Sequence, residues 1–169
     1  YGALLAVAGG KQRLRRYFDE AGWPSNAGDR GHADDPDRLI AGVHARKTEI
    51  FREIVQAGEM PPRPGVVRLA DAALAAGIAV AVCSTSDAAA VRAVVETVLG
   101  PERARRIGVF AGDAVAAKKP DPAVYTLALS ELGAAPERSV AVEDSRNGLL
   151  AAKAAGLACV VTPSAYTAG

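Results

Sequence analysis

The sequence lacks several features that would indicate a particular class of protein. It has only 2 cysteines in 169 residues, too few for a disulfide framework, so a reducing cytoplasm is the expected compartment. Its 20 basic residues balance 19 acidic ones to a net charge of +1, which gives no electrostatic footprint for nucleic acid. No apolar run approaches the roughly 20 residues of a membrane helix. We therefore expect a globular cytoplasmic protein with no nucleic-acid or membrane partner.

The hydrophobic pattern divides the chain into two parts. Residues 1–60 show helical periodicity without strand patterns, with helices expected over 11–20 and from Asp35-Pro36 to about Gln56. Over 61–169, short apolar runs alternate with helical patterns, which predicts parallel βαβ units and an α/β fold with helices on both faces of the sheet. The expected strands are 78–84, 107–111, 139–142 and 157–161, and the expected helices are 64–76, 87–99, 121–132 and 145–155. The almost wholly apolar run 78–84 is typical of a strand buried on both faces.

Polar residues follow two of these strands. Ser84-Thr85-Ser86 ends the first strand, Glu143-Asp144 ends the third, and Lys118-Lys119 stands before the helix 121–132. Ligands of an open parallel sheet bind beyond the carboxyl ends of its strands. Hydroxyls and backbone N–H groups hold phosphate oxygens, a lysine offsets their charge, and carboxylates hold Mg²⁺. Each group alone fits a helix cap or a solvated charge, but together they indicate a phosphoryl-transfer site. Cys83 should face the opposite side from Ser84 and pack in the core rather than act as a nucleophile.

Three segments carry a resemblance to a known family. Residues 80–86, the run Lys119-Pro120-Asp121-Pro122, and residues 142–148 resemble motifs II, III and IV of the haloacid dehalogenase superfamily. The segment GGKQRL at 9–14 is similar to the cap of its CbbY-like and β-phosphoglucomutase-like sugar-phosphate branch. The resemblance implies a Rossmann-like α/β core over 61–169 and a helical cap over 1–60.

The same resemblance implies a function and assigns its residues. It implies a Mg²⁺-dependent phosphatase that acts on a small phosphorylated sugar, of the xylulose-1,5-bisphosphate type, through an aspartyl-phosphate. Ser84 and the backbone at Thr85 would bind the phosphoryl group, and Lys119 would stabilise its charge in the transition state. Asp144, with Glu143 beside it, would face the Mg²⁺ ion.

The helical cap would contribute the remaining substrate contacts. Lys11 and Arg13, with Gly10 before them, would meet the distal phosphate or hydroxyls of the substrate, and Asn147 of the core would lie near the mouth of the site. The intact protein is expected to be a monomer. A phosphomutase on the same fold, a pseudoenzyme and a receiver-like binding module remain as alternatives.

One element of the family pattern is absent. The motif Asp-x-Asp-Gly-Thr, which carries the nucleophilic Asp, does not occur in the 169 residues, and the sequence starts at Tyr1 rather than Met. In the family the strand with this motif lies between the strands that here end at Ser84 and Asp144. We therefore expect a fragment cut at both ends, short by roughly 30 residues in front on the scale of a βαβ unit. Such a chain should be marginally stable and inactive by itself.

Overall fold

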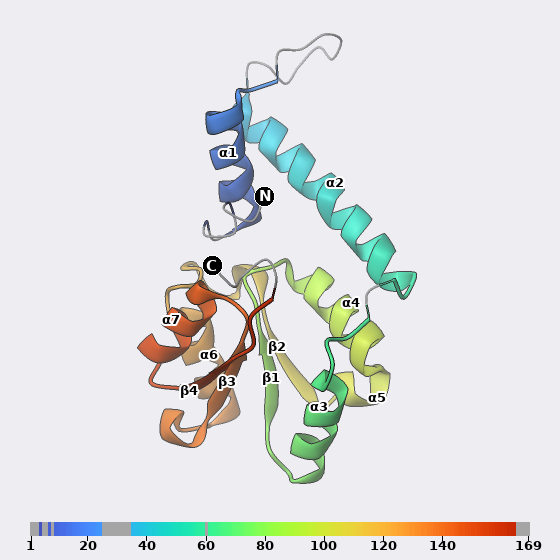
Figure 1. Cartoon of the computed structure of the whole chain (residues 1–169), viewed down its shortest axis with the longest axis vertical. Coiled ribbons are helices and arrows are strands. Elements are labelled where there is room, and N and C mark those ends of the chain that lie inside the picture. Colours follow the sequence, from blue (N-terminus) through green and yellow to red (C-terminus); the bar gives the residue numbers. More distant parts are fainter. Residues whose placement is uncertain (1–3, 5–6, 8, 25–34, 60, 165–169) are drawn as a thin grey trace.

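The structure, a computed structural model, describes residues 4, 7, 9–24, 35–59 and 61–164. Two helices, α1 (Gly10–Ala21) and α2 (Pro36–Gln56), stand over an α/β part that contains all the described strands (Figure 1). The lower end of α1, where this helix begins, lies nearest to the carboxyl ends of the strands (Figure 1). We call α1 and α2 the helical pair.

The start of α2 follows from its first residues. The Asp35 side chain accepts a hydrogen bond from the Arg38 N–H at 3.0 Å, and Pro36 occupies the first helical position. Ile40 near its beginning and Val55 near its end are 3% and 1% exposed. The helix is therefore packed at both ends, against α1 and against the α/β part. The sequence predicted both of its bounds.

The α/β part contains two parallel strand pairs. Strands β1 (Val80–Cys83) and β2 (Ile107–Phe110) form one sheet, and β3 (Val140–Glu143) and β4 (Ala158–Val161) form another. The helices of this part are α3 (Val66–Ala75), α4 (Ala88–Leu99), α5 (Pro101–Ala104), α6 (Ala123–Leu132) and α7 (Arg146–Ala154). The α/β class and the parallel pairing agree with the prediction. The short helix α5 and two 3₁₀ turns, Gly112–Ala114 and Pro136–Arg138, lie in segments for which the sequence predicted no helix or strand.

Each sheet has its own apolar core. Helices α3 and α4 bury Leu74, Val95 and Leu99 against Ile107 of the first sheet. In the second core, Val124 and Tyr125 of α6 and Ala151 and Ala152 of α7 pack against Ala141 of β3. Cys83 and Phe110 at the ends of the first sheet also contact this second core, so the two halves join near the carboxyl ends of the strands.

The expectation that the run 78–84 is buried on both faces is wrong, because β1 is only half-buried along its length, and β3 is exposed on one face. Val140 and Val142 of β3 are 63% and 51% exposed, and Ile78 before β1 is 59% exposed. The burial of β3 alternates along the strand: α6 and α7 pack on the face of Ala141, while Val140 and Val142 project from the opposite face. In addition, β1 pairs only with β2 and β3 only with β4, so each has one unpaired edge within the described residues. Among the described residues, no strand lies between β1 and β3. This agrees with the sequence, which lacks the motif of the strand that occupies this place in the family. None of the helices in the described ranges is long and apolar enough to cross a membrane.

Candidate functional site

Lys119 joins the two sheets at the carboxyl ends of their strands. Its Nζ donates to the carbonyl oxygen of Cys83 at 3.0 Å and to a carboxylate oxygen of Glu143 at 2.5 Å. The Tyr125 hydroxyl lies 3.2 Å from the same nitrogen, and its ring centroid lies 4.7 Å away. Only 12% of the Lys119 side chain is exposed. The ammonium is therefore buried, and partners from both sheets hold it in one place.

Glu143 is a buried carboxylate at the end of β3, 8% exposed. It accepts hydrogen bonds from Lys119 and from the Tyr125 hydroxyl. Burial and the carboxylate of Glu143 both raise the pKa of Tyr125, so its hydroxyl remains protonated and can donate. The backbone carbonyl of Glu143 accepts the N–H of Thr162 at 2.7 Å, which fixes β3 to the residue that follows β4.

Ser84 follows β1 beside the carbonyl that Lys119 contacts. Its N–H donates to Phe110 O at 2.9 Å, and its Oγ accepts the N–H of Ser86 at 3.1 Å. Since Oγ is already an acceptor, its own proton can be donated elsewhere, as binding to a phosphoryl oxygen requires. Thr85, the next residue, is half-buried.

Asp144 is the exposed carboxylate of this edge. It follows β3 directly and precedes Ser145, the N-cap of α7, whose hydroxyl accepts the Gly148 N–H at 3.1 Å. Asn147 lies half-buried in the first turn of the same helix. The structure therefore brings the predicted core residues to the edge where β1 and β3 end.

The donor set suits Mg²⁺ only in part. An exposed Asp144 carboxylate is a ligand of the kind that this hard cation prefers. One oxygen of Glu143, in contrast, already accepts two hydrogen bonds. No group of three or more His, Cys, Asp or Glu side chains arranged to hold a metal occurs in the ranges that the structure describes. By themselves, the described residues therefore do not form a complete metal site.

The predicted substrate residues of the helical pair lie on α1. Gly10 starts α1 and faces His44 so closely that an added Cβ would lie 2.6 Å from the imidazole Nε2. Lys11 is exposed and lines a groove of about 600 Å³ between α1 and α2. The guanidinium of Arg13 donates to the carbonyls of Leu4 and Val7, both at 3.2 Å, so it holds the backbone ahead of α1. Contacts of these three residues with a substrate stay a prediction.

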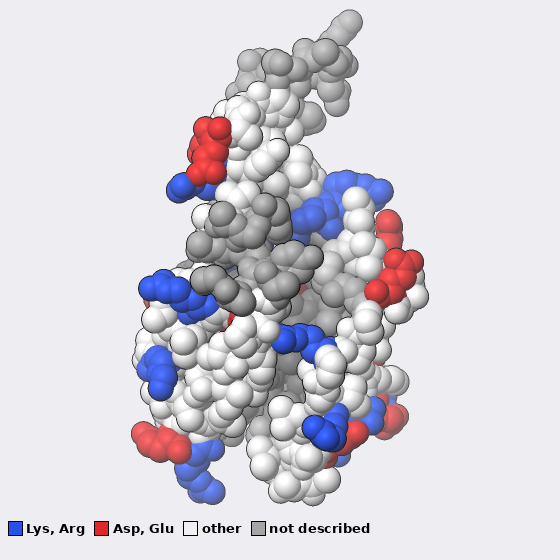
Figure 2. Space-filling model, in the orientation of Figure 1, with Lys and Arg blue, Asp and Glu red and all other residues white. Residues whose placement is uncertain are grey.

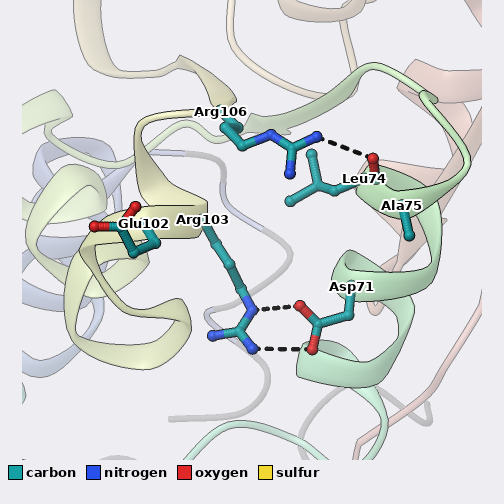
Figure 3. Close-up of a pocket in the computed structure, with 6 residues that line it drawn as sticks. All are labelled: Asp71, Leu74, Ala75, Glu102, Arg103 and Arg106. Atoms are coloured by element: carbon teal, nitrogen blue, oxygen red, sulfur yellow. Dashed lines mark hydrogen bonds and ion pairs between the residues drawn. The ribbon is translucent and has the colours of Figure 1, made fainter.

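A second pocket, of about 370 Å³, lies at the opposite end of the strands between α3 and α5 (Figure 3). Arg103 forms a two-point ion pair with Asp71 at 2.5 and 2.9 Å, and Arg106 donates to the carbonyl of Leu74 at 2.9 Å. Asp71 compensates the charge of Arg103, and Arg106 is bonded to a backbone carbonyl, so this pocket lacks the combination of lysine, hydroxyls and strand-end carboxylates found at the edge around Lys119. On the face in Figure 2, charged groups of both signs are scattered, with no continuous basic area among the described residues.

Three contributors to the site were not foreseen from the sequence. Tyr125 and Thr162 both donate hydrogen bonds to Glu143, and they are separated from it by 18 and 19 residues in the sequence. Gly148 packs against the Glu143 carboxylate, where an added Cβ would fall 1.8 Å from Oε2. A glycine inside the first turn of a helix was the one available signal, because glycine there costs helix stability unless space requires it.

The reactivity of the Cys83 thiol tests the packing at the end of β1. Burial raises the pKa of its thiol to about 11, and the side chain packs in the second core. We expect iodoacetamide at pH 8 to modify Cys83 much more slowly in the folded chain than in the denatured chain, because the thiol is protonated and partly buried. Peptide mass spectrometry measures the rate, with denatured chain as the reference. Modification of Cys83 in the folded chain at the denatured rate would contradict this packing.

The comparisons with known proteins agree with this geometry. The family model of the haloacid dehalogenase-like hydrolases matches residues 5–156. A CBBY-like protein of Arabidopsis thaliana is 52% identical over 99% of this chain and 52% of its own length. Protein CbbY of Cereibacter sphaeroides is 44% identical over 99% of this chain and 69% of its own length. The chain thus spans about half the length of its plant relatives and about two thirds of the bacterial one.

The chain is also similar to solved structures of this family. The crystal structure of a mutant of CbbY from Rhodobacter sphaeroides, in complex with xylulose-1,5-bisphosphate, superposes with a TM-score of 0.84. It is 42% identical in sequence, and the match covers 99% of this chain and 71% of that one. A β-phosphoglucomutase from Clostridium difficile shares the fold at a TM-score of 0.71 and 17% identity. The chain belongs to the haloacid dehalogenase-like hydrolases, in their CbbY-like group.

Proposed function

We propose that the protein to which this chain belongs is a Mg²⁺-dependent phosphatase of a small sugar bisphosphate, of the xylulose-1,5-bisphosphate type. The observation that carries the proposal is the buried Lys119 ammonium, fixed between the end of β1 and the carboxylate at the end of β3. The likeness to a CbbY that binds xylulose-1,5-bisphosphate supports the substrate class. Residues 1–60 would form the cap of this enzyme and residues 61–169 its core.

The roles of the core residues follow from their chemistry. The Ser84 hydroxyl can donate a hydrogen bond to one phosphoryl oxygen, and the Thr85 N–H can donate to a second phosphoryl oxygen. Lys119 offsets the negative charge on the phosphoryl oxygens during transfer, while Glu143 and Tyr125 keep its ammonium in place. Lys11 and Arg13, with Gly10 before them, would contact the distal end of the substrate, and Asn147 would border the entrance.

The nucleophile must come from outside these residues. The 169 residues contain no Asp-x-Asp-Gly-Thr motif, and the described part has unpaired edges on β1 and β3. A strand between these edges would place an Asp at the same end as Lys119. Its carboxylate would attack phosphorus as the P–O bond to the sugar breaks, and the second Asp of the motif would give its proton to the leaving oxygen and recover one from the water that enters next. Water would then hydrolyse the aspartyl-phosphate to free phosphate.

Mg²⁺ would be held by Asp144, with Glu143 beside it, together with carboxylates of that strand. When bound, it would neutralise part of the charge of the phosphoryl group. Because the nucleophile and some metal ligands would lie outside the 169 residues, we expect the isolated chain to be inactive.

A segment exchange tests this function. The matched segment of Cereibacter sphaeroides CbbY is replaced by the 169 residues, which supplies the remainder of a relative at 44% identity. We expect the exchanged protein to release phosphate from xylulose-1,5-bisphosphate only with Mg²⁺, and the isolated chain to release none. Glucose 1-phosphate and phosphoglycolate serve as comparison substrates. A folded exchanged protein without phosphatase activity would refute the proposal, and conversion of glucose 1-phosphate to glucose 6-phosphate would favour a mutase instead.

A further inference from the structure

Lys118 stands directly before Lys119 in the sequence, where it fits a solvated charge. The structure places it differently. Only 21% of its side chain is exposed, and its Nζ contacts three oxygens of the turn that follows β2. It donates to the carbonyls of Gly112 and Val115, the second at 3.1 Å, and to Asp113 Oδ1 at 3.3 Å. The ammonium is therefore a fixed part of this turn.

The contacts of Lys118 have a simple physical cause. Gly112–Ala114 is a 3₁₀ turn, and the carbonyls at the end of a helical turn lack N–H partners within it. A cation at that end satisfies these carbonyls and offsets their negative charge. The Asp113 carboxylate is fully exposed, so water screens its ion pair with Lys118. The two carbonyls are therefore the important partners.

The main chain of Lys118 is fixed on its other side. Its carbonyl accepts the N–H of Asp121 at 3.0 Å, and the Asp121 carboxylate accepts the N–H of Ala123 at 2.9 Å at the start of α6. Lys118 thereby joins the turn after β2 to the turn before α6. Since Lys119 lies between these two turns, the contacts of Lys118 determine where the Lys119 side chain starts.

The turn after β2 also packs against the loop after β1. Gly112 has a φ of 63°, and an added Cβ would lie 3.1 Å from the backbone nitrogen of Ala88 and 3.4 Å from the carbonyl oxygen of Ser86. The loop that begins with Ser84 therefore lies directly on the turn that Lys118 closes. A displacement of this turn would move both loops.

We propose that Lys118 is a positioning residue that sets the spacing between Ser84 and Lys119, the two side chains predicted to bind one phosphoryl group. Both donors must reach oxygens on the same phosphorus atom, so a small error in their spacing weakens the stabilisation of the transition state. The inference rests on the proposed function, since it assigns a role within that site. The effect of Lys118 on the two loops can be measured without activity.

Hydrogen exchange followed by mass spectrometry measures how firmly the loops are held. In the exchanged protein, Lys118→Met keeps the apolar stem and removes the ammonium. We expect the amides of 84–88 and 111–118 to exchange at least about fivefold faster, and those of β4 to be unchanged. The matched control is Lys153→Met, an exposed lysine in the last turn of α7, which should change neither loop. Unchanged exchange in both loops of Lys118→Met would overturn the proposal.

Kinetic constants separate positioning from a merely structural role. Lys118→Met should lower kcat for xylulose-1,5-bisphosphate about tenfold and change its KM less than about threefold, because both donors remain but are wrongly spaced. In a protein that already carries Lys119→Met, the same change should cost less than about threefold more, since Lys118 acts through Lys119. A tenfold loss in both backgrounds would contradict the proposal, as would a kcat of Lys118→Met within twofold of the unaltered protein.

A second variant tests which partners of Lys118 matter. Asp113→Asn removes the ion pair and keeps both carbonyls, so exchange and kcat should stay within about twofold of the unaltered protein. An effect as large as that of Lys118→Met would contradict a role through the carbonyls. If Lys118→Met does not fold, Lys118→Gln, whose amide can still donate to a carbonyl, takes its place. If the unaltered exchanged protein is inactive, the proposed function fails, while hydrogen exchange still decides whether Lys118 holds the loops.

Discussion

Replacing Gly148 by alanine is expected to destabilise the chain by about 3 kcal/mol, much more than a typical glycine substitution in a helix. An added Cβ would lie 1.8 Å from Glu143 Oε2 and 2.2 Å from its Cδ, so the carboxylate would have to move. It has little room, because Glu143 is 8% exposed and is held by Lys119 and Tyr125. Displacing it would separate a buried ion pair and leave the Lys119 ammonium without its counter-ion.

Urea unfolding followed by circular dichroism measures this effect. Gly42→Ala is the matched control, since Gly42 also lies inside a helix but has nothing within 4 Å of an added Cβ. That control should gain about 0.5–1 kcal/mol, because alanine favours the helix. If Gly148→Ala were equally stabilising, the close packing of α7 against Glu143 would be wrong.

The second large effect concerns the Lys119–Glu143 pair itself. Lys119→Met should cost about 3–5 kcal/mol in the free energy of unfolding, because it leaves a carboxylate buried without its cation. Glu143→Gln should cost a similar amount, since the ammonium would then be the unpaired charge. The double variant should lose much less than the sum of the two, because no isolated charge remains buried.

The double-mutant cycle is completed by urea unfolding of all four proteins. Lys153→Met, an exposed lysine in the last turn of α7, serves as control and should change the free energy of unfolding by less than about 0.5 kcal/mol. Additive losses in the cycle would mean that the two side chains do not interact, contrary to the geometry at 2.5 Å.

The helix ends could be predicted because their signals are local. Asp35 and Asp87 cap the helices that follow them through bonds to N–H groups three residues ahead. Gly133 ends α6 with a φ of 58°, a backbone angle that few other residues adopt. Each of these features depends on neighbours in sequence, so the pattern of residue types was enough to place it.

The exposure of Val140 and Val142 could not be predicted in the same way. Both residues have the apolar, branched side chains of a buried strand, yet their burial depends on what packs on their face of the sheet, and α6 and α7 pack on the opposite face, with Ala141. Tyr125 and Thr162 escaped prediction for a related reason, since they reach Glu143 from α6 and from beyond β4. Strand ends and motif order placed Ser84, Lys119 and Asp144 at one edge, while the contacts that fix Lys119 come from the tertiary structure.

The central claim is that the Lys119 ammonium at this edge stabilises phosphoryl transfer. The most direct measurement is the rate of phosphate release from saturating xylulose-1,5-bisphosphate by the exchanged protein, its Lys119→Met variant and its Lys153→Met control, all shown to be folded. We predict a loss of about 10²–10³-fold or more for Lys119→Met and an unchanged rate for the control. A folded Lys119→Met protein with a rate within threefold of the unaltered one would contradict the claim.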